Sequence, residues 1–311
     1  MNSSKRLENP FFTVVIPTYN REDLIEATLK SVLAQTYSNY EILIVDNAST
    51  DRTIQVLKPF LEEHDQITLI KNEKNLERSR ARNVGFRAAS GDFLTLLDSD
   101  DFMYRDSLKD AAEFVKKNQT VNFFHNYYEL VDSDWNTLKS YTFPSEKDQI
   151  KQLAKGNFIS CIGVYISREI YQAYEFNEDE KILGSEDWEL WLRVISKYPL
   201  KSIEKVNSGV LYHKGRSISA YSLKEVVKRK NYIIDEVLKN KAVQDIFGRY
   251  ESLMRGSAYL FTAVSANDAK LFNEAKKYLR RAAELWPPII FSKRFIRIAQ
   301  IANFKIERNL N

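Results

Sequence analysis

The sequence predicts an α/β fold with a doubly wound, mostly parallel sheet and a helical C-terminal extension. Short β-branched apolar runs alternate with segments of helical periodicity from residue 11 to residue 117, a pattern typical of parallel sheets covered by helices. From residue 222 onward the apolar spacing is helical and no strand-like run follows. A chain of 311 residues with 44% hydrophobic residues is large enough for one α/β domain and an appendage, or for two domains.

The first part of the chain contains four expected strands, each followed by an expected helix. The strands are the apolar runs at 11–17, 40–46, 67–72 and 92–98. The helices are expected at about 21–35, from residue 51, at 77–89 and at 107–117. Asn20, with Asp23 three positions later, resembles a capping box at the start of the first helix.

The pattern between residues 120 and 220 is less regular. Strands are expected at 121–132, at 157–167 and at 206–219, where the last strand runs into a basic loop. A helix is expected at 184–198, with Glu186 and Asp187 in its first turn.

The composition excludes several classes of protein. With 28% charged and 13% aromatic residues, the chain is neither disordered nor collagen-like. The single cysteine, Cys161, excludes an internal disulfide and favours a reducing compartment. The first ten residues lack the apolar core of a secretory signal, and no run of 18 apolar residues predicts a transmembrane helix. We therefore expect a cytoplasmic protein.

Polar side chains follow three of the four expected strands. Thr18, Tyr19 and Asn20 follow the first, Asp46 and Asn47 the second, and Asp98, Ser99, Asp100 and Asp101 the fourth. Ligands of doubly wound sheets bind beyond the carboxyl ends of the strands, so this set predicts a ligand site. The alternative is that these are ordinary turn residues.

The DSDD segment at 98–101 is the main candidate for metal binding. Hard divalent cations take oxygen ligands, and Mg²⁺ is usually held by one or two carboxylates and substrate phosphates. A metal held in this way neutralises charge on a departing phosphate. The alternative is that the acidic residues stabilise the first turn of the next helix.

Candidate residues also lie in the second part of the chain. A carboxylate of Glu186 or Asp187 can act as general base on a hydroxyl, or can simply be a favourable charge at a helix start. Trp188 can line an acceptor site or belong to the core. His213 can complete a metal shell, and Arg216 can hold phosphate, unless both are surface-loop residues.

Four segments in this order resemble family 2 glycosyltransferases of the GT-A fold. They are VVIPTYNRE (14–22), EILIVDNASTD (41–51), NLERSRARNVGFRAASGDFLTLLDSDD (75–101) and GSEDWELWLR (184–193). The resemblance covers roughly 14–220 and implies a GT-A, Rossmann-like sheet. It implies one domain at 1–220, with a nucleotide-binding half at about 11–101 and an acceptor half at about 102–220. Residues 221–311 then form a helical C-terminal region.

The resemblance also implies a role for each matching residue. Nucleotide binding is carried over to Thr18, Tyr19, Asn20, Asp46, Asn47, Arg82, Asp98 and Ser99. Metal binding is carried over to Asp100, Asp98 and His213, although the loop reads HKGRS where the family often has H-P-G-S. Asp187 matches the catalytic base, with Glu186 assisting, while Trp188 and Arg216 are expected near acceptor or phosphate.

The implied reaction is an inverting transfer of a sugar from a nucleotide-diphosphate sugar, with a UDP-sugar favoured, to an acceptor hydroxyl. Mn²⁺ or Mg²⁺ is the expected cofactor, and a glycan or lipid-linked acceptor in cell-surface polysaccharide synthesis is the expected partner. The Q-x-x-R-W element of processive synthases is absent. The alternatives are a catalytically silent sugar-nucleotide-binding scaffold and a sugar nucleotidyltransferase, but the glycine-rich phosphate loop of the latter is missing.

The charge is concentrated near the C-terminus. Residues 270–311 contain ten basic and three acidic residues, a larger positive excess than the +4 of the whole chain. With apolar residues on one helical face, this favours an anionic membrane surface as a partner and a peripheral position on the inner face of the membrane. The alternative is a terminal helix packed on its own domain. No nucleic-acid-binding module is recognisable.

Overall fold

The structure, a computed structural model, describes residues 7–213 and 222–308, with side chains through residue 302. The chain divides into two compact units. Unit 1 comprises residues 1–146, 159–178 and 198–217, and unit 2 comprises residues 147–158, 179–197 and 218–311. This division follows packing and differs from the expected boundary at residue 220, which stays a prediction.

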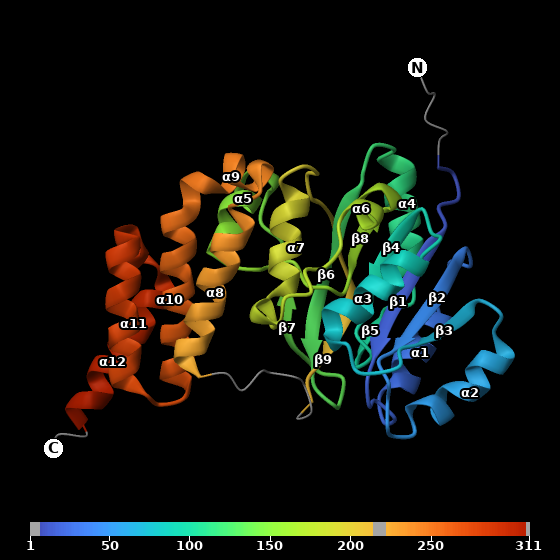
Figure 1. Ribbon diagram of the computed structural model, residues 1–311, viewed down its shortest axis with the longest axis horizontal. Coiled ribbons are helices and arrows are strands. Elements are labelled where there is room, and N and C mark those ends of the chain that lie inside the picture. The colour runs from blue at the N-terminus through green and yellow to red at the C-terminus, as the bar shows by residue number, and fades with distance from the viewer. Residues whose placement is uncertain (1–6, 214–221, 309–311) are drawn as a thin grey trace. The chain divides into compact units, whose positions relative to one another are not determined.

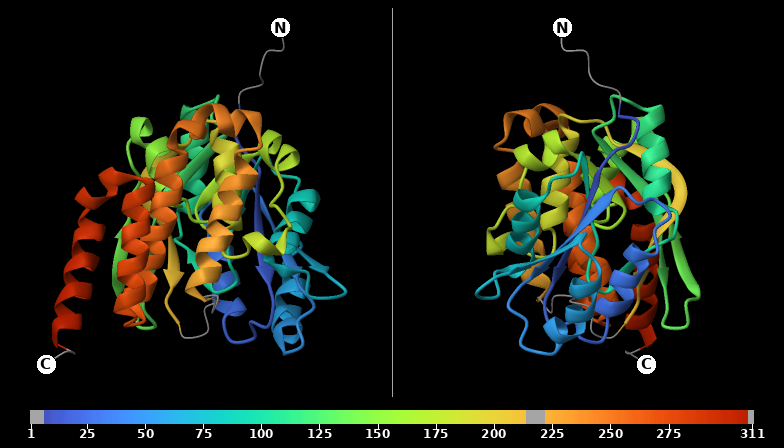
Figure 2. Two further views of the ribbon diagram at one scale, coloured as in Figure 1. Left: turned by 60° about the vertical axis from the view of Figure 1, so that its left-hand side comes forward. Right: turned by 90° about the vertical axis from the view of Figure 1, so that its right-hand side faces the viewer.

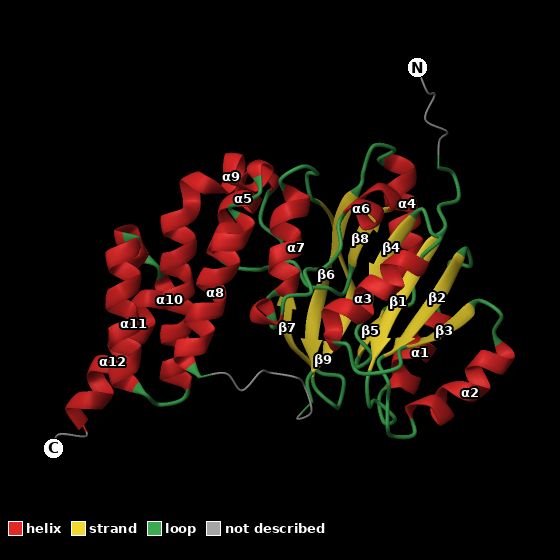
Figure 3. Ribbon diagram, viewed as in Figure 1, coloured by secondary structure: helices red, strands yellow, loops and turns green. Residues whose placement is uncertain are grey.

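Unit 1 contains a sheet whose first four strands are parallel, as expected (Figures 1 and 3). They lie in the order β3-β2-β1-β4. Their bounds are Phe12–Thr18 for β1, Tyr40–Asp46 for β2, Ile67–Lys71 for β3 and Phe93–Leu96 for β4. Helices α1 (Ile25–Leu33), α2 (Thr53–Glu63) and α3 (Glu77–Ala88) connect them. The α/β fold class is confirmed.

The capping box expected at Asn20 is wrong. Helix α1 begins only at Ile25, and its N-cap residue Leu24 makes no side-chain capping bond. The Asn20 side chain instead accepts a hydrogen bond from the Thr50 backbone in the neighbouring loop, at 2.8 Å. Asn20 therefore joins two loops and does not cap a helix.

The remainder of the sheet is mixed, a feature that the alternating pattern did not predict. The sheet continues from β4 through β8, β6, β9 and β5, while β7 pairs with β6 at the side. Only the β6–β9 pairing is parallel in this part. The bounds are Asp101–Met103 for β5, Phe123–Val131 for β6, Thr137–Tyr141 for β7, Val164–Ser167 for β8 and Lys201–Leu211 for β9. Helices α4 (Ser107–Lys117) and α6 (Arg168–Ala173) belong to the same unit.

Unit 2 is helical in the residues described. Its helices are α7 (Glu186–Ile195), α8 (Leu223–Val237), α9 (Lys241–Phe247), α10 (Glu251–Asp268), α11 (Phe272–Leu285) and α12 (Lys293–Arg308), together with nearly all of α5 (Glu146–Lys155). Three 3₁₀ turns connect them: η1 (Glu180–Ile182), η2 (Gly248–Tyr250) and η3 (Pro287–Phe291). The helical C-terminal extension is thus confirmed.

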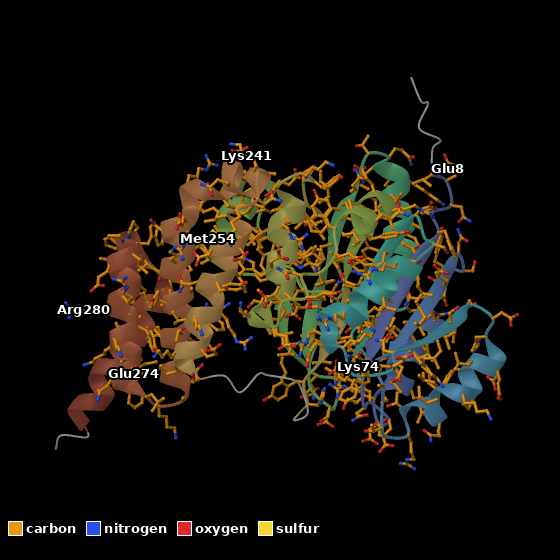
Figure 4. All side chains as sticks on the ribbon, in the orientation of Figure 1. Glu8, Lys74, Lys241, Met254, Glu274 and Arg280 are labelled. Carbon is orange, nitrogen blue, oxygen red and sulfur yellow. The ribbon has the colours of Figure 1, made fainter. Side chains whose placement is uncertain are left out.

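A separate apolar cluster holds the last three helices together. Leu260 of α10, Leu279 of α11 and Ile298 of α12 are all buried in it. These helices pack against one another and run from orange to red in Figure 2. Glu274 and Arg280 project from α11 in Figure 4. In the part of the chain that the structure describes, no helix is long and apolar enough to cross a bilayer.

Candidate functional site

Two buried polar atoms without hydrogen-bond partners mark the carboxyl ends of β1 and β2. Thr18 and Asp46 pair across the two strands, and each is 3% exposed. Neither the Thr18 Oγ1 atom nor the Asp46 Oδ1 atom has a partner in the structure, while Asp46 Oδ2 accepts a bond from the Ser49 backbone at 3.2 Å. A buried polar atom without a partner costs about 1–3 kcal/mol. These two atoms are therefore placed to form hydrogen bonds with a polar ligand.

The loops around this pair are held by two asparagines. Asn20 has a positive φ of 50°, and its N–H donates to Ser49 Oγ at 2.9 Å. The Asn47 side chain donates to Asn75 Oδ1 at 2.7 Å, and its own oxygen accepts from the Leu76 N–H at 3.0 Å. Both side chains therefore fix loop geometry. Tyr19, on the same edge, is 40% exposed.

Arg82 is buried and forms an ion pair with Asp98. Its Nη2 lies 2.9 Å from Asp98 Oδ1, and its side chain is 4% exposed against 30% for Asp98. The guanidinium also lies 5.2 Å from the centre of the Phe176 ring. Arg82 is thus placed to orient the Asp98 carboxylate, which faces solvent more than its partner does. Ser99, the next residue, is buried.

Asp100 and His213 meet although 113 positions separate them. His213 Nε2 lies 3.1 Å from Asp100 Oδ2, and Arg21 Nη2 lies 3.6 Å from the same oxygen. The contact arises because β5, which starts at Asp101, pairs with β9, which ends at Leu211. Sequence reasoning did not single out Arg21. Its position directly after Asn20 in the first loop was the available signal.

The donor types at Asp100 and His213 fit a divalent cation of the Mn²⁺ or Mg²⁺ kind. A carboxylate oxygen and an imidazole nitrogen at one point supply two ligands, and a diphosphate can supply others. Among the residues that the structure describes, no three His, Cys, Asp or Glu side chains form a metal-binding group. Asp98, the third expected ligand, has its Oδ1 atom bonded to Arg82, and its role in metal binding stays a prediction.

The candidate catalytic carboxylates lie at the start of α7 in unit 2. Glu186 is buried, and its Oε2 accepts a bond from the Gly184 N–H at 2.7 Å. Asp187 Oδ1 accepts a hydrogen bond from the backbone N–H of Trp188 at 2.7 Å, and Asp187 Oδ2 accepts one from the Asn157 side chain at 2.8 Å. The Asp187 carboxylate therefore accepts a hydrogen bond at each oxygen, which fixes its orientation.

Trp188 is a core residue, which corrects the expectation that it lines an acceptor site. It is 3% exposed, and its indole N–H donates to the Leu153 carbonyl at 2.9 Å. A buried ring whose polar group is already satisfied offers no surface to a substrate. Arg216 lies outside the described residues.

Lys230 of α8 is the second residue that sequence reasoning missed. Its Nζ lies 3.4 Å from Ser185 Oγ, 5.4 Å from the centre of the Trp188 ring and 4.6 Å from that of Phe261. Loss of solvent lowers the pKa of Lys230, and the charge of Asp187 acts in the opposite direction. The charge of Lys230 thus interacts with the carboxylate of Asp187, the candidate base.

Comparison with known proteins identifies the family. Residues 13–174 match the family described as Glycosyl transferase family 2. The chain belongs to this family. Among its relatives are two Escherichia coli proteins described as UDP-Glc:alpha-D-GlcNAc-diphosphoundecaprenol beta-1,3-glucosyltransferases. WfgD is 29% identical over 75% of this chain and 89% of its own length. WfaP is 30% identical over 71% and 84%.

Solved structures of other glycosyltransferases share the fold of this family 2 member. TarS 1-349 of S. aureus, in complex with UDP-GlcNAc, aligns with a TM-score of 0.70 at 18% identity, over 94% of this chain and 88% of that one. The mannosyltransferase PcManGT from Pyrobaculum calidifontis, in complex with GDP-Man and Mn2+, aligns with a TM-score of 0.58 at 18% identity, over 96% and 85%. The GT-A fold expected from the sequence is confirmed.

Proposed function

We propose that this family 2 glycosyltransferase moves a sugar from a UDP-sugar to an acceptor hydroxyl, with inversion, in the synthesis of a cell-surface polysaccharide. The observation that carries the proposal is the pair of buried, unpartnered atoms of Thr18 and Asp46. The names of the E. coli relatives, which specify UDP-Glc and a diphosphoundecaprenol acceptor, favour this donor and a lipid-linked acceptor.

The residues of unit 1 take the donor in this proposal. The Asp46 carboxylate accepts a hydrogen bond from an N–H of the nucleotide base, and Thr18 supplies a second polar contact. Asp98, oriented by Arg82, accepts from a ribose hydroxyl. Asp100 and His213 hold Mn²⁺ or Mg²⁺. The metal, when bound, supplies positive charge that stabilises the diphosphate leaving group.

The base in this proposal is Asp187 of unit 2. It removes the proton of the acceptor hydroxyl, and the oxygen then forms a bond to the anomeric carbon as the bond to the diphosphate breaks. The hydrogen bond from Asn157 keeps the carboxylate in one orientation. Asp187→Asn is expected to lower kcat about 10²–10⁴-fold, because a positioned general base contributes that much, while UDP binding is unchanged. Near-normal transfer by the folded variant would assign the base elsewhere.

Calorimetric titration tests the donor site directly. UDP, GDP, dTDP and CDP are titrated with and without Mn²⁺ into the wild type, Asp46→Ala and Asp100→Ala. Asp245→Ala, which removes an exposed carboxylate paired with Lys241, is the matched control. We expect UDP to bind best, Asp46→Ala to weaken it with or without Mn²⁺, and Asp100→Ala to remove the metal dependence. Nucleotide binding without sugar transfer would favour the silent scaffold, and no binding at all would contradict the proposal.

A membrane surface is the proposed partner of the C-terminal helices. Ile290, Phe291 and Ile296 are 41%, 80% and 44% exposed, and Lys293, Arg294 and Arg297 lie among them and are exposed as well. We call these six residues the C-terminal patch. No acidic residue occurs between residues 285 and 306. Exposed apolar side chains interspersed with cations are suited to the interface of an anionic bilayer.

A further inference from the structure

Trp135, between β6 and β7, has a backbone conformation and an exposure that are both unusual for tryptophan. Its φ is +66°, in the left-handed region that bulky residues rarely adopt. Its side chain is 59% exposed, although indole is a residue of cores and interfaces. A non-glycine residue in this region is strained, and such strain persists where the surroundings impose it.

The turn that carries Trp135 is held rigidly by one carboxylate. Asp132 Oδ1 accepts the backbone N–H groups of Asp134 and Asn136, each at 2.9 Å. The Trp135 N–H donates to the Asp132 carbonyl at 3.1 Å. The backbone around Trp135 is therefore fixed, and the indole is presented to solvent from a preorganised position.

The indole contacts Phe102, a residue of the strand that follows Asp100. Its ring centre is 4.8 Å from that of Phe102, in an edge-on contact, and Phe102 is two residues from Asp100. β5, β9 and β6 are neighbours in unit 1, and their pairing brings the turn after β6 beside the end of β9. Gly209 of β9 allows the Phe102 ring to approach, because a Cβ there would lie 2.0 Å from it.

A second exposed aromatic residue occupies the same edge of the sheet. Tyr212 follows β9, is 57% exposed and donates its N–H to the Val131 carbonyl, next to the Trp135 turn, at 2.7 Å. His213, the next residue, contacts Asp100. Figure 1 shows the turn after β6 and the end of β9 together at the lower edge of the sheet. Two solvent-exposed rings thus lie at this edge of unit 1, Trp135 against Phe102 and Tyr212 next to His213, which contacts Asp100.

We propose that Trp135, with Tyr212, forms an aromatic surface that stacks against a pyranose ring of one of the two substrates. The inference rests on the proposed function and adds a sugar contact that Trp188 cannot supply. One face of a pyranose presents C–H groups, which pack on an aromatic ring, while its hydroxyls stay in water or bond to neighbours. The two possible sources of the ring are the sugar of the donor and the sugar of the acceptor.

Glycine at position 135 separates a binding role from a structural one. Trp135→Gly removes the indole and also relieves the cost of the positive φ, so its unfolding temperature is expected to equal or exceed that of the wild type. Trp135→Phe keeps an aromatic face. Leu138→Ala is the matched control, because Leu138 is 52% exposed on the adjacent strand β7.

Each source of sugar has its own measurement. The donor measurement is the ratio of the affinities for UDP-Glc and UDP in the presence of Mn²⁺. The acceptor measurement is the affinity for an α-GlcNAc-diphosphate with a short alkyl chain, relative to the alkyl diphosphate without sugar. We expect Trp135→Gly to lose about tenfold in one of these ratios, which corresponds to the loss of one aromatic contact. Trp135→Phe should lose less, and Leu138→Ala nothing.

The outcomes distinguish this inference from the proposed function. If the wild type binds UDP but Trp135→Gly changes neither ratio, the aromatic surface does not bind sugar. A large fall in the unfolding temperature of Trp135→Gly with both ratios unchanged assigns Trp135 to the fold, and loss of vesicle binding alone assigns it to a membrane. If the wild type does not bind UDP, the proposed function itself fails.

Discussion

Asp187 illustrates how two residues far from each other in sequence set the properties of one carboxylate. The Asn157 side chain donates a hydrogen bond to Asp187 Oδ2, and the charges of Lys230 and Asp187 attract each other. Both effects stabilise the ionised carboxylate, which is the form that a general base needs. Lys230 also lies near the Ser185 hydroxyl and the rings of Trp188 and Phe261, and the negative charge of Asp187 raises its pKa against the effect of burial.

Removal of either partner should move the pH dependence of transfer. In Asn157→Ala and in Lys230→Met, the acidic limb of the kcat profile is expected to shift to higher pH, because the carboxylate becomes easier to protonate. Loss of a hydrogen bond to a charged group is worth about 1.5–3 kcal/mol, so kcat of Asn157→Ala should fall at least about tenfold on the acidic limb, where kcat follows the ionised fraction of the base. Lys230→Arg, which keeps the charge, should restore the limb. A fall in kcat with an unmoved limb would make both residues purely structural.

His125 gives a second prediction, on stability. Burial lowers its pKa from 6.5 to about 4, while the carbonyls of Asn126 and Ser160, which face its two ring nitrogens, act in the opposite direction. Between these pH values the unfolded chain binds a proton that the folded chain excludes. The free energy of unfolding should therefore fall by about 3 kcal/mol as the pH drops from 6.5 to 4. Urea unfolding across this range measures it, and His125→Gln should lose that slope. An equal slope in the variant would contradict the assignment.

Motifs pointed to the residues proposed to bind the donor more clearly than to those around the proposed base. Thr18, Asp46, Asp98 and Asp100 follow strands, so periodicity alone placed them at one edge of the sheet. Lys230 lies on a helix of ordinary amphipathic pattern, and nothing local distinguishes it from a surface lysine. Trp188 could not be assigned from sequence, because burial depends on what covers the helix.

At the scale of elements, the contact between α3 and β1 depends on the absence of one side chain. A Cβ on Gly85 of α3 would lie 2.3 Å from Val15 Cγ1 of β1. Glycine normally costs a helix about 1 kcal/mol relative to alanine, so its presence here reflects the close approach. This packing supports the helix that carries Arg82.

Gly85→Ala should therefore destabilise the protein, opposite to the effect that helix propensity alone predicts. Forcing a methyl group into a packed interface costs about 1–3 kcal/mol. The free energy of unfolding from urea titration is the measurement. Adding Val15→Ala removes both Cγ methyls and should make the effect of Gly85→Ala smaller or reverse its sign. A stabilising effect of Gly85→Ala in the wild-type background would mean that β1 and α3 separate easily.

Local pattern predicted the elements of the parallel half and little of the mixed half. β1 to β4 are continuous apolar runs separated by helices, and they pair with one another in parallel, as this pattern predicts. β8, β6, β9 and β5 pair across long separations, and apolar runs carry no information on direction. The β6–β7 turn with Trp135 was missed for the same reason.

At the scale of the whole molecule, charge is the property that sequence and structure describe together. The bases of residues 270–311 include two groups of three that differ in their surroundings. Lys277, Arg280 and Arg281 on α11 form ion pairs with Glu274 and Glu284. The bases of the C-terminal patch lie where the sequence has no acidic residue. Of these two groups, the second presents charge without nearby acids in the sequence, together with exposed apolar side chains.

Vesicle flotation should separate these two groups of cations. We expect the wild type to float with vesicles containing phosphatidylglycerol and not with phosphatidylcholine alone. Each base near an anionic surface contributes about 1 kcal/mol, so Lys293→Glu, Arg294→Glu and Arg297→Glu together should weaken binding at least about 100-fold. The same reversal at Lys277, Arg280 and Arg281 is the matched control and should have a smaller effect, because it removes charges that acids already neutralise.

Phe291→Ser should weaken vesicle binding at every salt concentration, whereas the contribution of the basic residues should fall as the salt concentration rises. Equal losses from the two triple variants would mean that net charge alone, and not the C-terminal patch, attracts the protein to lipid.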